Sequence, residues 1–243
     1  MKPPNKIYEF HVSNLQIIDA SINRVALSLR RAISQRDEVT TYTFVRLYAL
    51  LLGAWAECRL CKLLYEPSGF NGQARDRINS TSTHLDRWQT AVELAFRKHY
   101  GVPRAVLSQI SLPHSAYSRY ITLINMLQAD LRPIIELRNK LAHGQWVYPL
   151  NNEGNDVAQE QMDSLLVENL LSLQFKKALI SHLSMAIHDL VVSQPTFERD
   201  FDKRYQDIVD TRRNLQTRNY QSWVAQMQKK YQRGKEKKIG GRP

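Results

Sequence analysis

Apolar residues recur every three or four positions along most of this chain, which is the period of an amphipathic α-helix. The first apolar face advances in steps of 3, 4, 3, 4 and 4 residues and consists of Leu15, Ile18, Ile22, Val25, Leu29 and Ile33. A second face spans residues 42–65, and its apolar positions are Phe44, Leu47, Leu51, Trp55, Leu60 and Leu64. Both patterns predict long helices, and the second helix ends before Pro67 and Gly69.

Capping residues, prolines and glycines mark the limits of the next two helices. A third helix begins near Thr83, where the spacing to an acidic residue resembles a capping box, and it stops at Gly101. A fourth runs from Pro113 to His143, bends at Pro133 and closes at the glycine that follows. These boundaries predict two further helices.

The C-terminal half continues the helical pattern after one interruption. Residues 145–168 contain an Asn- and Gly-rich stretch and are expected to form short strands or a long loop. A fifth helix covers 170–192, and a sixth begins at Thr196. Since the chain holds only 9 Gly and 9 Pro and shows no internal repeat, an all-α fold is predicted, a bundle of long antiparallel helices.

Charge divides the chain into a near-neutral body and a basic C-terminal arm. The whole chain has 34 Lys and Arg against 23 Asp and Glu, a net charge of +11. Residues 199–243 hold 13 of the basic and 5 of the acidic residues, so +8 of that charge lies in the arm. We therefore expect a helical domain over 1–195, a basic helix over 196–233 and a flexible basic tail over 234–243.

Several classes of protein are excluded by what the sequence lacks. No apolar run approaches the ~18 residues of a membrane span, and the N-terminus has no apolar signal region, so no membrane association is expected. The two cysteines, Cys58 and Cys61, cannot form a disulfide framework, which favours a cytoplasmic protein. They also lie within a helical segment without a second pair, so they are interpreted as packing residues and no metal is expected.

The enzyme motifs that depend on a cofactor or a nucleophilic elbow are missing as well. There is no phosphate-binding Gly-rich loop, no G-x-S-x-G and no H-E-x-x-H. We therefore expect no cofactor.

One segment combines an apolar face with polar chemistry. When residues 134–144 are placed on a helix, Arg138 falls in the middle of an apolar arc formed by Ile134, Ile135, Leu137, Leu141 and Ala142. An Arg on a core-facing stripe is costly unless it is paired or faces a polar cavity. His143 is the last helical residue and lies about 140° around the helix from Arg138.

The string Arg138-Asn139-Lys140-Leu141-Ala142-His143 resembles the R-x4-6-H signature of the HEPN superfamily, a group of small all-helical proteins. A polar residue follows the Arg in that family, as Asn139 does here. The segment ALLLGAWAECRLCKLLY, at 49–65, resembles the family's other core helix, and the resemblance covers residues 40–192. The resemblance implies a metal-independent endoribonuclease that acts as a homodimer, with a toxin or phage-defence role and an antitoxin or sensor protein as partner.

Under this resemblance each residue of the motif has a chemical role. RNA supplies its own nucleophile, the 2′-hydroxyl, and His143 would exchange protons with it or with the leaving 5′-oxygen because imidazole titrates near neutral pH. Arg138 would bind the phosphate bidentately. Asn139 would orient the imidazole or bond a phosphate oxygen, and Glu57 is the acidic candidate to pair with Arg138 or assist the histidine. Two copies facing each other would bury the apolar stripe and bring the Arg and His to one phosphate.

The basic residues suggest an RNA-binding surface, since Lys and Arg contact phosphates and aromatic side chains stack on bases. The candidates are Lys140, Arg212, Arg213, Lys229, Lys230 and Lys235, the arm positions lying near Tyr220, Trp223 and Tyr231. Three alternatives stay open: a solvated helix with a solubilising tail, a non-catalytic HEPN module that binds RNA or a partner protein, and a helical protein whose basic arm docks on an acidic partner.

Overall fold

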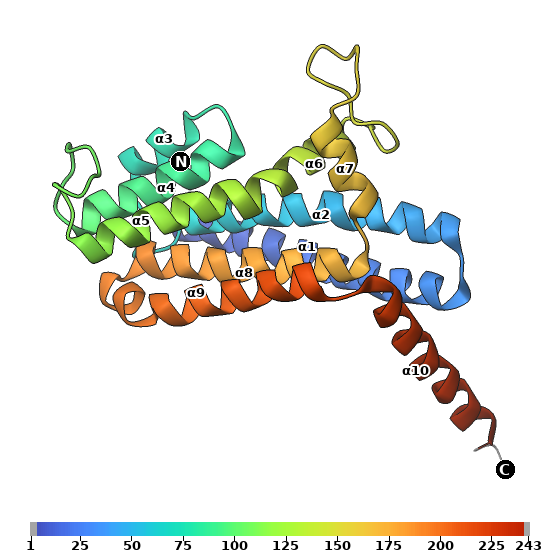
Figure 1. The fold of residues 1–243 in the computed structure, drawn as a ribbon. Helices are drawn as coiled ribbons and strands as arrows, with labels where there is room; N and C mark the ends of the chain where they lie inside the picture. The colour runs from blue at the N-terminus through green and yellow to red at the C-terminus, as the bar shows by residue number, and fades with distance from the viewer. Residues whose placement is uncertain (1–3, 241–243) are drawn as a thin grey trace.

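The computed structural model describes the backbone of residues 4–240 and the side chains of residues 5–234. Among these residues every regular element is a helix, and the only other pairing is an isolated bridge between Leu150 and Val157 (Figure 1). The all-α prediction is confirmed. The helices in order are α1 (Pro4–Gln35), α2 (Glu38–Leu64), α3 (Gly72–Asn79), α4 (His84–His99), α5 (His114–Met126), η1 (Leu127–Leu131), α6 (Arg132–Ala142), α7 (Gln159–Val167), α8 (Leu170–Val192), α9 (Gln194–Thr217) and α10 (Tyr220–Gly240).

Helices α1 and α2 form an antiparallel hairpin with a very short connection. Arg36 adopts a left-handed backbone with φ of 59°, which reverses the chain in two residues. Asp37 then caps α2 by accepting a hydrogen bond from the Thr40 amide at 3.0 Å. The predicted apolar face of α1 is buried against its neighbours at Ile22, Leu29 and Ile33.

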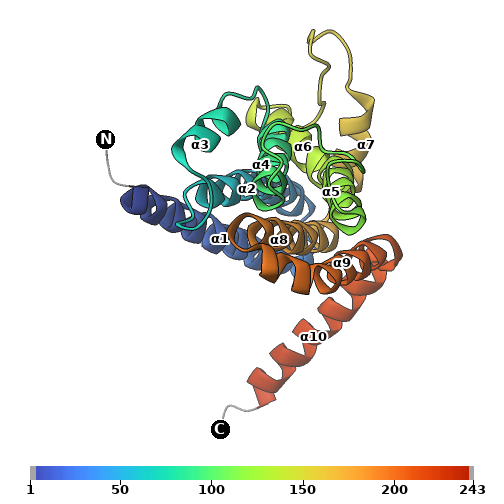
Figure 2. The same ribbon diagram turned by 90° about the vertical axis from the view of Figure 1, so that its left-hand side faces the viewer.

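Helix α8 is the centre of the bundle. It is surrounded by α1, α2, α4, α5 and α9 (Figure 2), and its leucines and isoleucines are buried around most of its circumference. Helix α9 returns along it after a tight connection in which Ser193 caps the new helix. Because Phe197, Phe201 and Ile208 of α9 are buried in the same core, the bundle continues to Thr217 and does not end at 195 as expected.

The fourth predicted helix is divided by one wider turn. Residues Leu127–Leu131 form a π-helical turn in which the Arg132 amide bonds to the Leu127 carbonyl, five residues back. Pro133 follows immediately and has no N–H to continue the α-helical ladder, which accounts for the wider turn at this place. The helix before it is α5, and the helix after it is α6, which carries the motif.

Two short helices were not predicted, and one predicted helix is broken. Helix α7 occupies the end of the segment expected to be strand or loop, and α3 lies between α2 and α4. The single helix expected over 196–233 is two, because Asn219 accepts a hydrogen bond from the Ser222 amide at 2.8 Å and caps α10 afresh. The α10 backbone stays helical through Gly240, past the expected start of the tail at 234, while residues 241–243 lie outside the described part.

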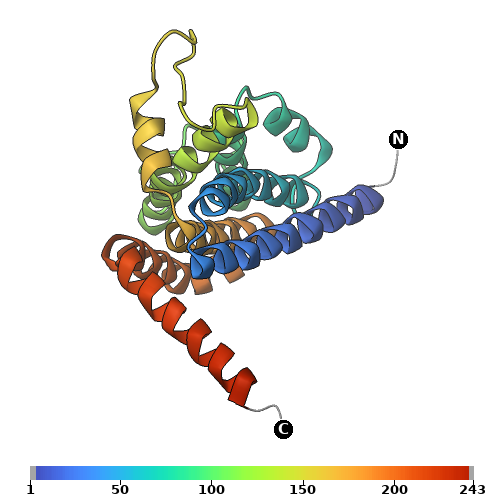
Figure 3. The same ribbon diagram turned by 90° about the vertical axis from the view of Figure 1, so that its right-hand side faces the viewer.

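Helix α10 leaves the bundle on the side opposite to α6 and α7 (Figures 1 and 3). It touches α1 through its first turns, and the Gln228 amide donates to the Ile33 carbonyl at 3.3 Å. Among the described residues, no helix combines the length and the apolarity needed to cross a bilayer.

Candidate active site at the junction of helices α2, α4 and α6

The end of helix α6 is fixed by a complete Schellman motif. Gly144 has a φ of +77°, and its amide bonds to the Leu141 carbonyl at 3.1 Å. The Gln145 amide bonds to the Lys140 carbonyl at 3.0 Å, so both hydrogen bonds that define the motif are present. The predicted stop at Gly144 is therefore confirmed. His143 is the capping residue, and its side chain is exposed to solvent.

Arg138 reaches the interior of the molecule by crossing the backbone of α2 at a glycine. A methyl group at Gly53 would lie 2.6 Å from the Arg138 Cγ, closer still to its Cβ, and 3.4 Å from the Ile134 carbonyl oxygen. Only glycine therefore permits α6 to approach α2 this closely. Glu57 lies one turn further along α2, on the same face as Gly53, where the guanidinium of the crossing side chain ends.

Glu57 is shared between two nitrogen groups. Its Oε1 forms an ion pair with the Arg138 guanidinium and lies 3.0 Å from the Nε2 of His84, the first residue of α4. The Arg138 side chain is 20% exposed and that of Glu57 17%. The pairing of Glu57 with Arg138 expected from the sequence is confirmed, and it satisfies a guanidinium that would otherwise be buried alone.

Asn139 completes the arrangement around Arg138. Its Oδ1 accepts a hydrogen bond from the Arg138 Nη1 at 2.8 Å, so among the described residues its side chain orients the guanidinium and not the imidazole of His143. Burial lowers the pKa of Arg138, and the guanidinium remains charged because arginine is not deprotonated in proteins. The guanidinium is thus oriented by a hydrogen bond to Asn139 and an ion pair with Glu57.

Arg87 adds a second guanidinium to this junction. It lies one turn after His84 on α4, and its Nε is buried without a hydrogen-bond partner among the described residues. Burial lowers the pKa of His84, and the charge of Arg87 lowers it further. Arg87 therefore adds a positive charge on the α4 side of the junction, beside His84.

The apolar stripe around Arg138 is buried within a single chain. Ile134, Ile135, Leu137 and Leu141 are all at most 6% exposed, because α6 packs along α2. The expectation that a second copy would bury this stripe was wrong, because α2 already covers it where Gly53 allows α6 to approach closely. Arg138 points inward from the stripe and His143 outward, so one chain does not direct both side chains to the same point.

The loop after His143 is anchored to the start of α2 through Trp146. Its indole N–H donates to the Leu141 carbonyl at 2.9 Å. Its own carbonyl accepts from the Tyr42 hydroxyl at 2.9 Å and from the Arg46 Nε at 3.1 Å. Arg46 is buried, and its guanidinium lies 3.3 Å from the centre of the Tyr42 ring. These contacts hold the backbone on both sides of His143 in place.

All three basic candidates outside α10 are engaged within the protein. The Lys140 ammonium donates to the Leu150 carbonyl, and Arg213 is paired with Asp210. Arg212 forms two hydrogen bonds with Asp130 of η1, at 2.5 and 3.2 Å, which join α9 to the π turn and raise the pKa of Arg212. These three side chains have structural roles that the sequence pattern did not indicate.

The candidates on α10 are placed differently. Lys229 and Lys230 are exposed on α10, whereas the side chain of Lys235 lies outside the described residues. The excess charge of the arm therefore faces solvent on α10 and is partly neutralised on α9.

The two cysteines are free and packed within α2, and burial raises the pKa of both thiols. In the part of the chain that the structure describes, no group of three or more His, Cys, Asp or Glu side chains is placed to hold a metal ion. Comparisons with protein-family models, with curated proteins and with solved structures find no match to this chain.

Sequence reasoning missed Gly53, His84 and Arg87 as parts of this site. Gly53 is the only glycine inside the long helical pattern of α2, and an isolated glycine in a helix often marks a close packing contact, so this signal was readable. His84 and Arg87 had no such signal. They come from α4 and reach Glu57 only through the tertiary fold.

Proposed function

We propose that this chain is a metal-independent endoribonuclease of the HEPN type, with Arg138 and His143 as its catalytic residues. The observation that carries the proposal is the arrangement of α6: an oriented, partly exposed guanidinium and, five residues later, an exposed imidazole on a rigid helix cap. The positive charge that Arg87 adds to the junction supports binding of a phosphodiester.

Arg138 has the capacity to bind a phosphate without giving up its internal partners. A guanidinium has five N–H donors; one bonds to the Asn139 Oδ1, and the Nη2 is ion-paired with Glu57. The remaining donors are available to phosphate oxygens, where they would stabilise the charge that develops as the 2′-hydroxyl attacks. His143 would transfer the proton, as general base to the 2′-hydroxyl or general acid to the 5′-oxygen.

The active unit in this proposal is a two-fold dimer. The dimer follows from the HEPN resemblance, and in it the partly exposed guanidinium of one chain and the exposed imidazole of the other would meet at one phosphate. The toxin or phage-defence setting, with an antitoxin or sensor protein as partner, rests on the HEPN resemblance. A cytoplasmic location and RNA as the substrate belong to the same proposal.

The decisive experiment compares His143→Ala with the matched exposed variant His114→Ala. Purified protein is incubated with total RNA in EDTA, and the ends of the fragments are analysed. We expect cleavage by the wild type and His114→Ala, with 2′,3′-cyclic phosphate and 5′-hydroxyl ends, and a loss of about 10²–10⁴-fold in His143→Ala. Full activity of His143→Ala, or equal cleavage of 2′-O-methylated RNA, would overturn the mechanism.

A non-catalytic RNA-binding or partner-binding module is the second candidate. It is favoured by one observation, the neutralisation of Arg138 by Glu57 inside the fold. This function predicts that RNA binds without being cut and that His143→Ala leaves the affinity unchanged. The same assay, with binding measured beside cleavage, separates the two functions.

A further inference from the structure

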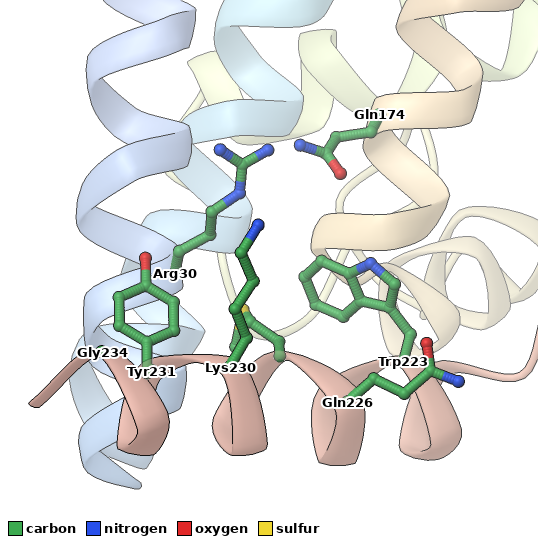
Figure 4. A pocket seen from close by; sticks show the side chains of 8 residues that line it. Arg30, Gln174, Trp223, Gln226, Lys230, Tyr231 and Gly234 are labelled. Carbon is green, nitrogen blue, oxygen red and sulfur yellow. The ribbon is translucent and has the colours of Figure 1, made fainter. Parts of the chain in front are cut away.

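A cavity of about 750 Å³ lies between α1, α8 and the first turns of α10. This volume is within the range of about 300–1,000 Å³ that small-molecule sites occupy. Figure 4 shows the Arg30 guanidinium, the Lys230 ammonium and the Gln174 amide converging on it, with the Trp223 ring to one side and the Tyr231 ring to the other. The cavity is on the side of the bundle opposite to α6 and α7.

The charge of this cavity suits an anion. Its lining includes Arg30 and Lys230 and no carboxylate. Within the described residues neither cation forms an ion pair, whereas the nearby Lys177 is paired with Asp19 at 2.6 Å. Two cations from separate helices, both free and both facing one space, would bind a phosphate group better than either would alone.

The walls of the cavity suit a flat aromatic ring. Trp223 is held in place because it packs on the bundle core and stacks on Tyr220, with ring centroids 5.9 Å apart and planes at 20°. Tyr231 lies two turns further along the same helix. Every nucleobase has a π-face that stacks on such side chains, and the amides of Gln174 and Gln226 offer donors and acceptors to a base edge.

We propose that this cavity is a nucleotide-binding site, in which Arg30 and Lys230 bind the phosphate and the base stacks on Trp223 or Tyr231. The ligand is either a free nucleotide or one nucleotide of a single-stranded RNA, since both present the same base and phosphate. The inference stands without the ribonuclease proposal. It also gives Lys230 a specific role that total charge alone did not predict.

A neighbouring cavity distinguishes the two sources of the ligand. It has a volume of about 630 Å³, shares Gln174 with the first, and is lined on its other side by Arg59 and by the ion-paired Lys177 and Asp19. A single nucleotide fills the first cavity only, whereas an RNA strand of several nucleotides would continue into the second. Arg59→Gln should therefore weaken binding of an oligonucleotide and leave binding of a mononucleotide unchanged, because Arg59 forms no ion pair within the described residues, whereas Lys177 is paired with Asp19.

The test measures binding of adenosine 5′-monophosphate and of a labelled oligoadenylate of eight residues to the full chain. Arg30→Gln and Lys230→Gln should each lower the affinity for both probes about 10-fold or more, the cost of losing a charged hydrogen bond. Tyr231→Leu should lower it about 5- to 150-fold if the base stacks there. The matched controls are Arg31→Gln and Lys229→Gln, exposed neighbours that do not line the cavity.

Equal losses in Lys229→Gln and Lys230→Gln would overturn the proposal, since they would show only diffuse attraction to a basic helix. Failure of both probes to bind would overturn it as well. Inorganic phosphate that competes as strongly as the mononucleotide would show an anion site without a base, which contradicts the nucleotide assignment. Cleavage of RNA is not the readout, so a failure of the ribonuclease proposal leaves this result unaffected.

Discussion

Replacing Gly53 with alanine tests how the candidate site is built. The added methyl would lie 2.6 Å from the Arg138 Cγ and closer to its Cβ, against an ordinary carbon–carbon contact of about 3.5–4.0 Å. The Cβ of Arg138 cannot rotate away, because the backbone of α6 fixes its position. The overlap of about 1 Å must therefore be relieved by moving α6 away from α2.

The expected size of the effect follows from two opposing terms. Overpacking of this kind costs up to about 3 kcal/mol, and replacing a helical glycine with alanine returns about 1 kcal/mol of helix propensity. Gly53→Ala should therefore lower the free energy of unfolding by about 2 kcal/mol, which for a chain of this length lowers Tm by about 4–8 °C. Gly234→Ala in α10, where no atom lies within 4 Å of the added methyl, should cause no loss.

Thermal and urea unfolding of a short variant series would measure the effect. Arg138→Ala keeps the Cβ, so Gly53→Ala should remain destabilising in that background. Arg138→Gly removes the Cβ, and there Gly53→Ala should become neutral or stabilise the protein by about 1 kcal/mol. The same loss in both backgrounds would refute the contact between Gly53 and Arg138 as the reason for the glycine.

Three further outcomes are expected. Burial lowers the pKa of His11, His84 and His99, so the unfolded state binds more protons than the folded state below pH ~6.5. The free energy of unfolding should therefore fall as the pH is lowered from there, and a flat pH profile would contradict this. Arg138→Met should raise the pKa of His84, measured by NMR titration, because the Glu57 carboxylate then has a single cationic partner. Removal of residues 229–243 should lower the RNA affinity and reduce its log–log salt slope by about 0.7 per lost phosphate contact; an unchanged slope would assign the arm to solubility.

The long helices were readable from the sequence because each has one strong apolar face and a local stop signal. Gly144 is an example, since the Schellman motif it makes needs only residues 140–145. Helix α7 was missed because only Leu165 in it is buried, so its sequence carries no clear apolar period. The break between α9 and α10 was missed because Asn219 is a cap in one context and an ordinary surface residue in another.

The candidate site was readable only where its residues share a helix or meet on adjacent apolar faces. Arg138 and Asn139 are adjacent in sequence, and Glu57 was identifiable because it lies on the other strongly apolar helix. His84 and Arg87 come from a third helix, and no periodicity indicates that this helix begins beside Glu57. The partners of Arg212 and Lys140 were missed for the same reason. Arg212 bonds to a side chain that is distant in the sequence, and Lys140 bonds to a backbone carbonyl of a loop, so both contacts depend on the completed fold.

The Glu57–Arg138 pair is compatible with a structural role and with a catalytic one, because the two roles use different donors of one guanidinium. Glu57 gives the half-buried Arg138 an ion-pair partner, which supports the fold whatever the protein does. Its negative charge, however, also opposes an incoming phosphate. Arg87, which pairs with no carboxylate among the described residues, offsets that charge from the α4 side. A phosphate at this junction would therefore depend on α4 as well as on the motif of α6, which places the boundaries of the candidate site beyond the R-x4-H string.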